Sequence, residues 1–170
     1  ILPEGVEKIG SYAFANLTAL EEIVFPSTLT EIDYGAFYGC KNLKKITFSG
    51  ENNLKIINKE AFAGCDLTGQ LDLPAAYVIG DYAFANNSNL TGITLPETLT
   101  TIGDMALYKC KYYTELTIPA SVTTITDNPF RCCQNLTEIL VEEGNGEFCS
   151  EDGVLYDLYQ SVLVSYPCGK

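Results

Sequence analysis

The chain has 170 residues, of which 46% are apolar, and its 22 acidic and 10 basic residues give a net charge of -12. This composition is sufficient for a buried core, but nucleic-acid binding is not expected because it requires clustered lysines and arginines. No run of about 18 apolar residues occurs, so we expect no membrane insertion. Because the first residue is Ile1 rather than Met, we interpret the sequence as a fragment or a processed product, with any leader or anchor outside it.

Three apolar columns recur along most of the chain with a shared spacing. The first column contains Phe14, Phe37, Phe62, Phe84, Leu107 and Phe130. The second, the isoleucine column, contains Ile9, Ile32, Ile57, Ile79, Ile102 and Ile125. The third contains Ile23, Ile46, Leu71, Ile93, Leu116 and Ile139. All three share steps of 23, 25, 22, 23 and 23 residues, irregular steps included. A period near 23 residues predicts a solenoid in which each repeat forms one coil.

The end of each coil is predicted to be a short strand. In the first coil, Ile23 and Phe25 alternate around Val24 with the period of a strand, and Pro26 lacks the amide that would continue a ladder. Stacked coils would place six such strands side by side, about 4.8 Å apart, in one parallel sheet. We therefore expect every residue of the third column to be buried.

The middle of each coil is predicted to contain a turn and then a short helical segment. The position after the isoleucine column is Gly10, Asp33, Asn58, Gly80, Gly103 or Thr126. Because Gly, Asp and Asn best tolerate a positive φ, we expect a left-handed residue there. Three residues after the first column comes a core position with Leu17, Cys40, Cys65, Asn87, Cys110 or Cys133. These side chains are expected to bond backbone amides left unpaired by the curve.

Coil three departs from the pattern after Phe48. Residues 49–53 replace the proline that ends other strands, so a protruding loop is expected there.

The phrase L-P-x-x-V-x-x-I-G-x-x-A-F-x-x-C-x-x-L-x-x-I-x-L-P resembles the BspA-type leucine-rich repeat over residues 1–141, most completely from Leu29 through Phe48 and from Leu99 through Pro119. The resemblance implies an α/β solenoid, a right-handed array of about six coils that is mostly β with short helical turns and has a parallel sheet on its concave side. In that family such an array is often followed by a segment like residues 148–170, here with a β-hairpin of Val154–Tyr156 and Leu163–Tyr166. We therefore predict two regions: the array in residues 1–141, and an acidic loop with this hairpin in residues 142–170. The resemblance also implies a secreted or cell-surface protein that adheres to or binds host or partner proteins.

No catalytic residue, cofactor or metal is expected. The chain has no histidine, which removes the usual general base and the commonest metal ligand, and it has no phosphate-binding glycine motif. The acidic stretch from Glu142 to Asp157 could suit a calcium ion, but it lacks the EF-hand spacing, and a solvated loop is the favoured interpretation.

The seven cysteines leave two interpretations open. Four stand in the core column as neighbouring pairs: Cys40 with Cys65, and Cys110 with Cys133. Stacked coils would bring each pair within disulfide range, but buried free thiols are the favoured state. Cys149 and Cys168, both in the tail, could also pair with each other.

The candidate binding residues are the outward side chains of the six strands. One row contains Glu22, Lys45, Gln70, Gly92, Glu115 and Glu138. The other contains Val24, Thr47, Asp72, Thr94, Thr117 and Leu140. These rows form no convergent catalytic cluster, and a shallow surface of equivalent positions suits a protein or peptide partner. All except Gly92 are predicted to form a protein-binding face on the concave side.

Two functions remain open. The first is a non-catalytic binding module, expected to be a monomer, of a secreted or cell-surface protein. The second is an architectural spacer that holds another domain away from the cell surface. A contiguous exposed apolar or aromatic patch would favour the binding module, whereas an evenly polar surface would favour the spacer. An ice-binding array based on Thr47, Thr94 and Thr117 is disfavoured because Asp72 interrupts the row, and an enzyme is disfavoured by the missing histidine.

Overall fold

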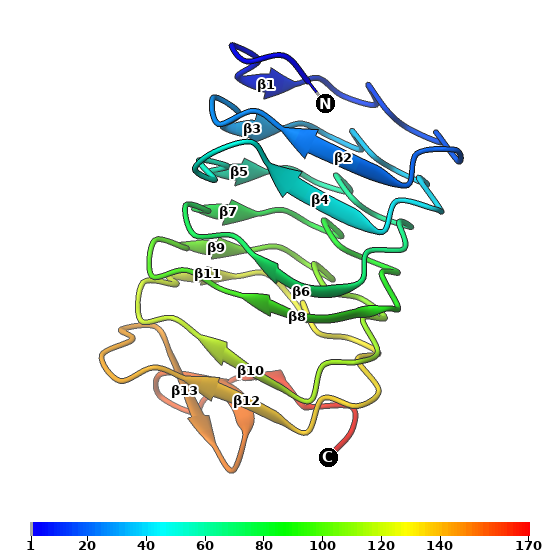
Figure 1. Ribbon diagram of the computed structural model, residues 1–170. Helices are drawn as coiled ribbons and strands as arrows, with labels where there is room; N and C mark the ends of the chain where they lie inside the picture. Colours follow the sequence, from blue (N-terminus) through cyan, green and yellow to red (C-terminus); the bar gives the residue numbers. More distant parts are fainter. Residues whose placement is uncertain (1) are drawn as a thin grey trace.

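The computed structural model describes residues 2–170, which form a right-handed solenoid of about six coils stacked one below the other (Figure 1). Every regular element in residues 2–170 is a β-strand or a turn, so the expected short helical segments are not formed. Consequently this part of the chain holds no helix with the length and apolarity to cross a membrane.

A continuous parallel sheet runs along the isoleucine column. Its six strands, in spatial order, are β1 (Lys8–Ile9), β3 (Glu31–Ile32), β5 (Ile56–Ile57), β7 (Val78–Ile79), β9 (Thr101–Ile102) and β11 (Thr124–Ile125). The isoleucines set the register, since Ile9 lies opposite Ile32 and Ile32 opposite Ile57. These side chains are buried, apart from Ile125 on the last strand, which is half-buried.

The strands of the third column do not form the single six-stranded sheet predicted from the sequence. They are β2 (Glu22–Phe25), β4 (Lys45–Phe48), β6 (Gly69–Asp72), β8 (Leu90–Thr94), β10 (Glu115–Ile118) and β12 (Glu138–Val141). They pair in parallel only as β2 with β4, β6 with β8, and β10 with β12. We call their outward side the strand face.

The break between β4 and β6 follows from the sequence of coil three. Its core leucine, Leu67, comes one residue early, so that Thr68 stands where Leu43 and Leu90 stand in the neighbouring coils. The Thr68 hydroxyl donates to the carbonyl of Lys44 (3.3 Å) instead of filling the core. Gly69, at φ +77°, then shifts the register of β6 against β8. Pairing with β4 is lost, and Ile46 is half-buried rather than buried as predicted.

Tyr113 occupies the same leucine position in coil five and is also out of pattern. Its ring is buried, with 2% of its surface exposed, and its phenolic oxygen has no hydrogen-bond partner in the described structure. This larger side chain coincides with the second break, between β8 and β10.

The segments predicted to be helical are instead turns with two left-handed positions in each coil. In the first coil these are Tyr12 (φ 57°) and Asn16 (φ 60°), two residues before and after Phe14. Left-handed residues interrupt a right-handed helix. The amides of Tyr12, Phe14 and Asn16 donate to carbonyls of the next coil at 2.7–3.0 Å, so they are not free for helical bonds. The prediction that the position after the isoleucine is left-handed is wrong: the left-handed residue comes two positions later.

A stack of phenylalanines fills the centre of the solenoid. Phe14, Phe37, Phe62 and Phe84 lie face to face with ring centroids 4.9, 5.1 and 5.5 Å apart and interplanar angles of at most 8°. Phe37, Phe62 and Phe84 are fully buried, whereas Phe14 in the first coil is half-buried. Neighbouring coils therefore stabilise one another through the same ring-to-ring contact at each step of the stack.

The loop inserted in coil three is held by side-chain hydrogen bonds. Residues 49–55 lie outside any strand, as expected for this insertion. Asn53 donates to the carbonyl of Ser27 (3.0 Å), and Asn52 donates to the carbonyl of Asp72 (3.1 Å). The insertion is thus tied to the coil on either side of it.

The tail forms a separate antiparallel sheet beside the last coil. Its strands are β13 (Phe148–Glu151), β14 (Val154–Asp157) and β15 (Leu163–Ser165). The predicted hairpin corresponds to β14 and β15, in which Leu155 lies opposite Ser165, while β13 was not predicted. The amide of Ile139 in β12 donates to the carbonyl of Gly153 (2.9 Å), so this sheet covers the free edge of β12.

Candidate protein-binding face

The strand face carries the predicted binding residues, with unequal exposure. Eight of them are exposed: Glu22, Lys45, Gln70, Asp72, Thr94, Glu115, Thr117 and Glu138. Val24, Thr47 and Leu140 are half-buried. Leu140 lies in β12, and the tail packs against this strand. The contact is close: a Cβ added to Gly153 of the tail would stand 3.2 Å from the α-carbon of Glu138 in β12. The face is therefore most accessible over its central coils.

A hydrogen-bond network fixes the side chains at the centre of the strand face. The amide nitrogen of Gln70 donates to the Thr94 hydroxyl (2.9 Å), and that hydroxyl donates to Oδ1 of Asp72 (2.7 Å). Gly92 lies beneath the Gln70 amide, because a Cβ there would stand 2.1 Å from Gln70 Oε1. The missing side chain at position 92 thus allows Gln70 to lie flat across two strands.

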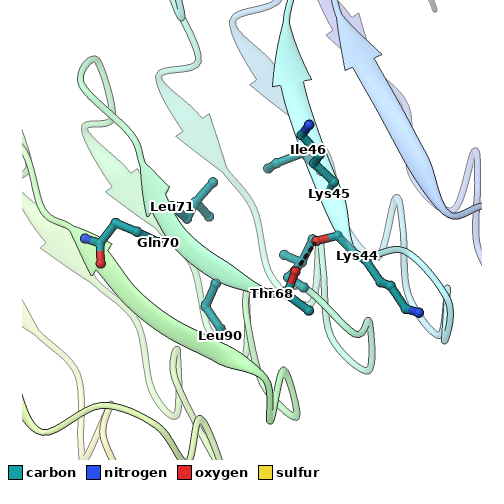
Figure 2. Close-up of a pocket in the computed structure, with 8 residues that line it drawn as sticks. Lys44, Lys45, Ile46, Thr68, Gln70, Leu71 and Leu90 are labelled. Atoms are coloured by element: carbon teal, nitrogen blue, oxygen red, sulfur yellow. Dashed lines mark hydrogen bonds between the residues drawn. The ribbon is translucent and has the colours of Figure 1, made fainter.

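A hollow of about 330 Å³ opens at the break between β4 and β6. Figure 2 shows Ile46 and Leu71 on the two strands that border it, with Thr68 bonded to the backbone of Lys44. Its lining combines apolar and polar residues: Lys44, Lys45, Ile46, Leu67, Thr68, Gln70, Leu71 and Leu90. Its lysines, with Lys41, form the densest basic group of an otherwise acidic chain. The hollow therefore places basic and apolar side chains next to each other.

A second hollow, of about 810 Å³, lies at the carboxyl ends of β6 and β8. It is lined by Asp72, Leu73, Pro74, Thr94, Leu95, Pro96, Glu97, Thr98 and Glu142, and we call it the proline groove.

Sequence reasoning missed both hollows. For the first, the detectable signal is Leu67, which stands one residue out of its column. The second hollow has no such signal, because Glu142 belongs to the tail and reaches the groove only in the folded chain.

Few charges on the molecule are neutralised. The ion pairs recorded within residues 2–170 are those of Lys8 with Glu31 (2.9 Å) and with Asp33 (3.1 Å), which lie beside the six-stranded sheet. The amide of Tyr34 and the nearby Lys8 ammonium lower the pKa of Asp33. On the strand face, Glu22 lies opposite Lys45 in the register without a recorded ion pair. The charges of the strand face are therefore available to a partner.

All seven cysteines are free thiols in the structure. The four in the core column are buried, which agrees with the interpretation favoured for them, and Cys149 is not joined to Cys168. In the core column each thiol donates to a carbonyl of the first column one coil earlier, for example Cys40 to Phe14 (2.9 Å) and Cys133 to Leu107 (3.1 Å). Burial raises the pKa of Cys65 and Cys110, and it raises that of Cys133 to about 12. These thiols are neutral structural donors rather than nucleophiles.

Asn87 takes the place of a cysteine in coil four and makes more bonds than a thiol can. Its amide nitrogen donates to the carbonyls of Phe62 (2.9 Å) and Phe84 (2.8 Å), and its oxygen accepts from the amide of Leu67 (3.1 Å). The expectation that this core side chain bonds a backbone amide is therefore confirmed for Asn87, whereas the core cysteines donate to carbonyls instead. The additional acceptor of Asn87, its side-chain oxygen, bonds the amide of Leu67, which is the residue that departs from the repeat.

The acidic stretch of the tail does not gather into a cation site. Within the described range, 2–170, no group of three or more Cys, Asp or Glu side chains is placed to hold a metal ion. Asp157 instead accepts the hydroxyl of Ser161 and the amide of Val162, both at 2.6 Å, and these bonds lower its pKa. It closes the turn between β14 and β15.

Residues 1–78 and 55–151 match the BspA type leucine rich repeat region, in six copies. Among solved structures, the pneumococcal vaccine antigen PcpA is 31% identical, with a TM-score of 0.83 over 96% of this chain and 43% of that one. A leucine rich cell surface protein from Faecalibacterium prausnitzii is 28% identical, with a TM-score of 0.72 over 95% of this chain and 50% of that one.

A leucine-rich repeat protein from Eubacterium ventriosum is 27% identical, with a TM-score of 0.61 over 99% of this chain and 38% of that one. The chain thus spans half or less of the length of these solved relatives. No match was found among curated protein sequences. The matched repeat region covers nearly all coils of the solenoid, and the chain therefore belongs to the BspA-type leucine-rich repeat proteins.

Proposed function

We propose that this chain is a non-catalytic protein-binding module of a secreted or cell-surface protein, and that its partner contacts the strand face. The observation that carries the proposal is the arrangement of that face. Exposed polar side chains of both charges stand on paired strands, are fixed by bonds such as Gln70 to Thr94, and border two hollows. Rigid, preorganised side chains lose little entropy on binding, which favours recognition of a protein surface.

The proposed location follows from the relatives. One solved relative is described as a pneumococcal vaccine antigen and another as a cell surface protein. Both descriptions suit a molecule presented outside the cell. The acidic surface, whose one dense basic group is Lys41, Lys44 and Lys45, fits a protein partner better than a nucleic acid.

The distribution of exposed apolar residues favours a binding role over a spacer, but it also points to a second surface. Large exposed apolar side chains gather in the tail: Leu158, Tyr159, Val162, Leu163 and Tyr166, with Tyr159 84% exposed. None of the large exposed apolar side chains of residues 2–170 lies on the strand face. The spacer therefore remains the second candidate, and a test must separate the strand face from the tail.

The test is a pull-down of extracellular-matrix and host-surface proteins with the chain and three variants. The strand-face variant carries Lys45→Glu, Thr94→Arg and Thr117→Arg, all at exposed positions. Its matched control carries Lys59→Glu, Thr123→Arg and Thr126→Arg, which are also exposed but lie outside the strand face. The tail variant carries Tyr159→Ser and Val162→Ser.

We expect a captured partner to be lost with the strand-face variant alone, while circular dichroism and the melting temperature show that all variants are folded. Loss with the tail variant alone would place the contact on the tail. Retention by every variant would contradict the strand face as the site. Capture of no partner by any of them would favour the spacer.

A further inference from the structure

The proline groove combines an apolar lining with carboxylates from two coils and from the tail. Leu73 is buried, Leu95 and Pro96 are half-buried, and Pro74 is exposed. Asp72 ends β6, Glu97 follows β8, and Glu142 follows β12, and all three are exposed. A volume of about 810 Å³ lies within the range of about 300–1,000 Å³ that is usual for ligand sites.

The groove is negatively charged without a compensating base. No lysine or arginine lines it. None of its three carboxylates takes part in the ion pairs recorded in the described part of the chain. The net charge of -12 adds a long-range field of the same sign, which attracts cationic partners.

Hydrogen bonds hold two of the carboxylates in place before any partner arrives. The Thr94 hydroxyl donates to Oδ1 of Asp72 (2.7 Å), and the amide of Ala120 donates to Oε2 of Glu142 (2.9 Å). Each bond occupies one oxygen and leaves Oδ2 of Asp72 and Oε1 of Glu142 for another donor. The Asp72 and Glu142 side chains are therefore already restricted, so they lose less conformational entropy when a cation of the partner binds.

We propose that the proline groove binds a basic and apolar segment of a protein partner. A lysine or arginine of that segment lies against Asp72, Glu97 and Glu142, and a neighbouring apolar side chain packs on Pro74, Leu95 and Pro96. The inference rests on the proposed function, because it names the partner chemistry of the same face. A small metal ion is a poorer occupant, since the three carboxylates do not converge as a ligand set.

The test uses a synthetic peptide and needs no captured partner. The probe is a fluorescein-labelled peptide of sequence Gly-Leu-Arg-Pro-Leu-Gly, and its twin carries Gln in place of Arg. Binding to the folded chain is followed by fluorescence anisotropy at low and high ionic strength. We expect saturable binding of the Arg peptide with a Kd below about 1 mM, at least about tenfold weaker binding of the Gln peptide, and loss of the difference at high salt.

Matched variants locate the site. Glu97→Gln with Glu142→Gln removes two charges from the groove, and the glutamine at 142 can still accept the Ala120 amide. Glu7→Gln with Glu51→Gln removes two exposed charges elsewhere, so the net charge is the same. We expect the groove variant to weaken the Arg peptide about three- to tenfold and the control to weaken it less than twofold.

Three results would overturn the groove: equal losses in both double variants, equal binding of the two peptides, or no binding at about 1 mM. The groove proposal would also be overturned if a partner captured through the strand face bound the Glu97→Gln, Glu142→Gln variant as well as the unmodified chain. That result would leave the proposed function in place. The two proposals can therefore fail separately.

Discussion

Gly103 lies directly against the backbone of Asp81 in the preceding coil. A Cβ on Gly103 would stand 2.3 Å from the Asp81 backbone nitrogen, closer than any real contact. Gly80 meets the backbone of Lys59 in the same way, at 2.7 Å. In the first coil, a Cβ on Gly10 would meet no heavy atom within 4 Å. At positions 80 and 103 glycine is therefore required by the close approach of the preceding coil and not by a positive φ.

Gly103→Ala should destabilise the chain because backbone atoms of Asp81 cannot move aside as a side chain would. We expect a loss of about 1–3 kcal/mol in the free energy of unfolding, measured by urea denaturation. Gly10→Ala is the matched control in the same column and should change stability by less than about 0.5 kcal/mol. Similar losses at the two positions would contradict the close-approach account.

The phenylalanine stack should be most sensitive at its centre. Phe62→Ala or Phe84→Ala opens a cavity between two neighbouring coils and should cost about 3–5 kcal/mol. Phe14→Ala should cost less, because Phe14 is half-buried in the first coil, whereas Phe62 and Phe84 are fully buried. The measurement is the denaturation midpoint of each variant, and equal shifts at all three sites would argue against a quasi-linear array.

Tyr113→Phe should stabilise the chain. The Tyr113 hydroxyl is buried without a partner, and burial raises its pKa well above the ordinary value, so it stays a neutral, unsatisfied group. Removing it should raise the free energy of unfolding by about 1 kcal/mol. Tyr112→Phe, at an exposed neighbour, serves as the control. A clear loss of stability in Tyr113→Phe would show that the hydroxyl has a partner in solution.

Stability should fall at alkaline pH because of the buried thiols. Burial raises the pKa of Cys133 to about 12, whereas an unfolded cysteine ionises near 8.5. The folded state therefore keeps a proton that the unfolded state releases. The contribution is fully present below about pH 8.5 and is lost progressively as the pH rises toward about 12.

The measurement is the urea midpoint from pH 8 to pH 11. We expect a smaller decrease in Cys133→Ala than in the unmodified chain. Gln134→Ala, at an exposed neighbouring position that does not titrate, should keep the slope of the unmodified chain. Identical slopes in all three proteins would contradict the assignment to the core column.

The solenoid could be predicted from the sequence because three columns repeat with the same irregular steps. The alternation around Ile23 and the proline that follows are local signals, and they identified the strand positions correctly. The helical segments were wrong for a physical reason. The amide of Phe14 bonds to Ala36 of the next coil, and the sequence of one coil does not show where its amides point.

The candidate site could be predicted only in outline. The alternation of apolar and polar residues along each strand predicted which side chains point outward. It could not show that Thr68 stands in place of a core leucine and that a hollow opens beside Ile46. It also could not show that Glu142 lines the proline groove, because the other lining residues precede Glu142 by about 45–70 positions. The division of the chain at residue 141, the monomeric state and the binding role of the strand face stay predictions.

The most direct test of the central proposal is hydrogen exchange of the chain with and without its captured partner, followed by mass spectrometry of peptic fragments. If the partner contacts the strand face, exchange should slow in residues 68–72, 90–98 and 115–118, which contain β6, β8 and β10. Residues 10–17 and 33–40, on the turn segments, should be unchanged. Slower exchange confined to the turn segments or to residues 154–166 of the tail would contradict the proposal.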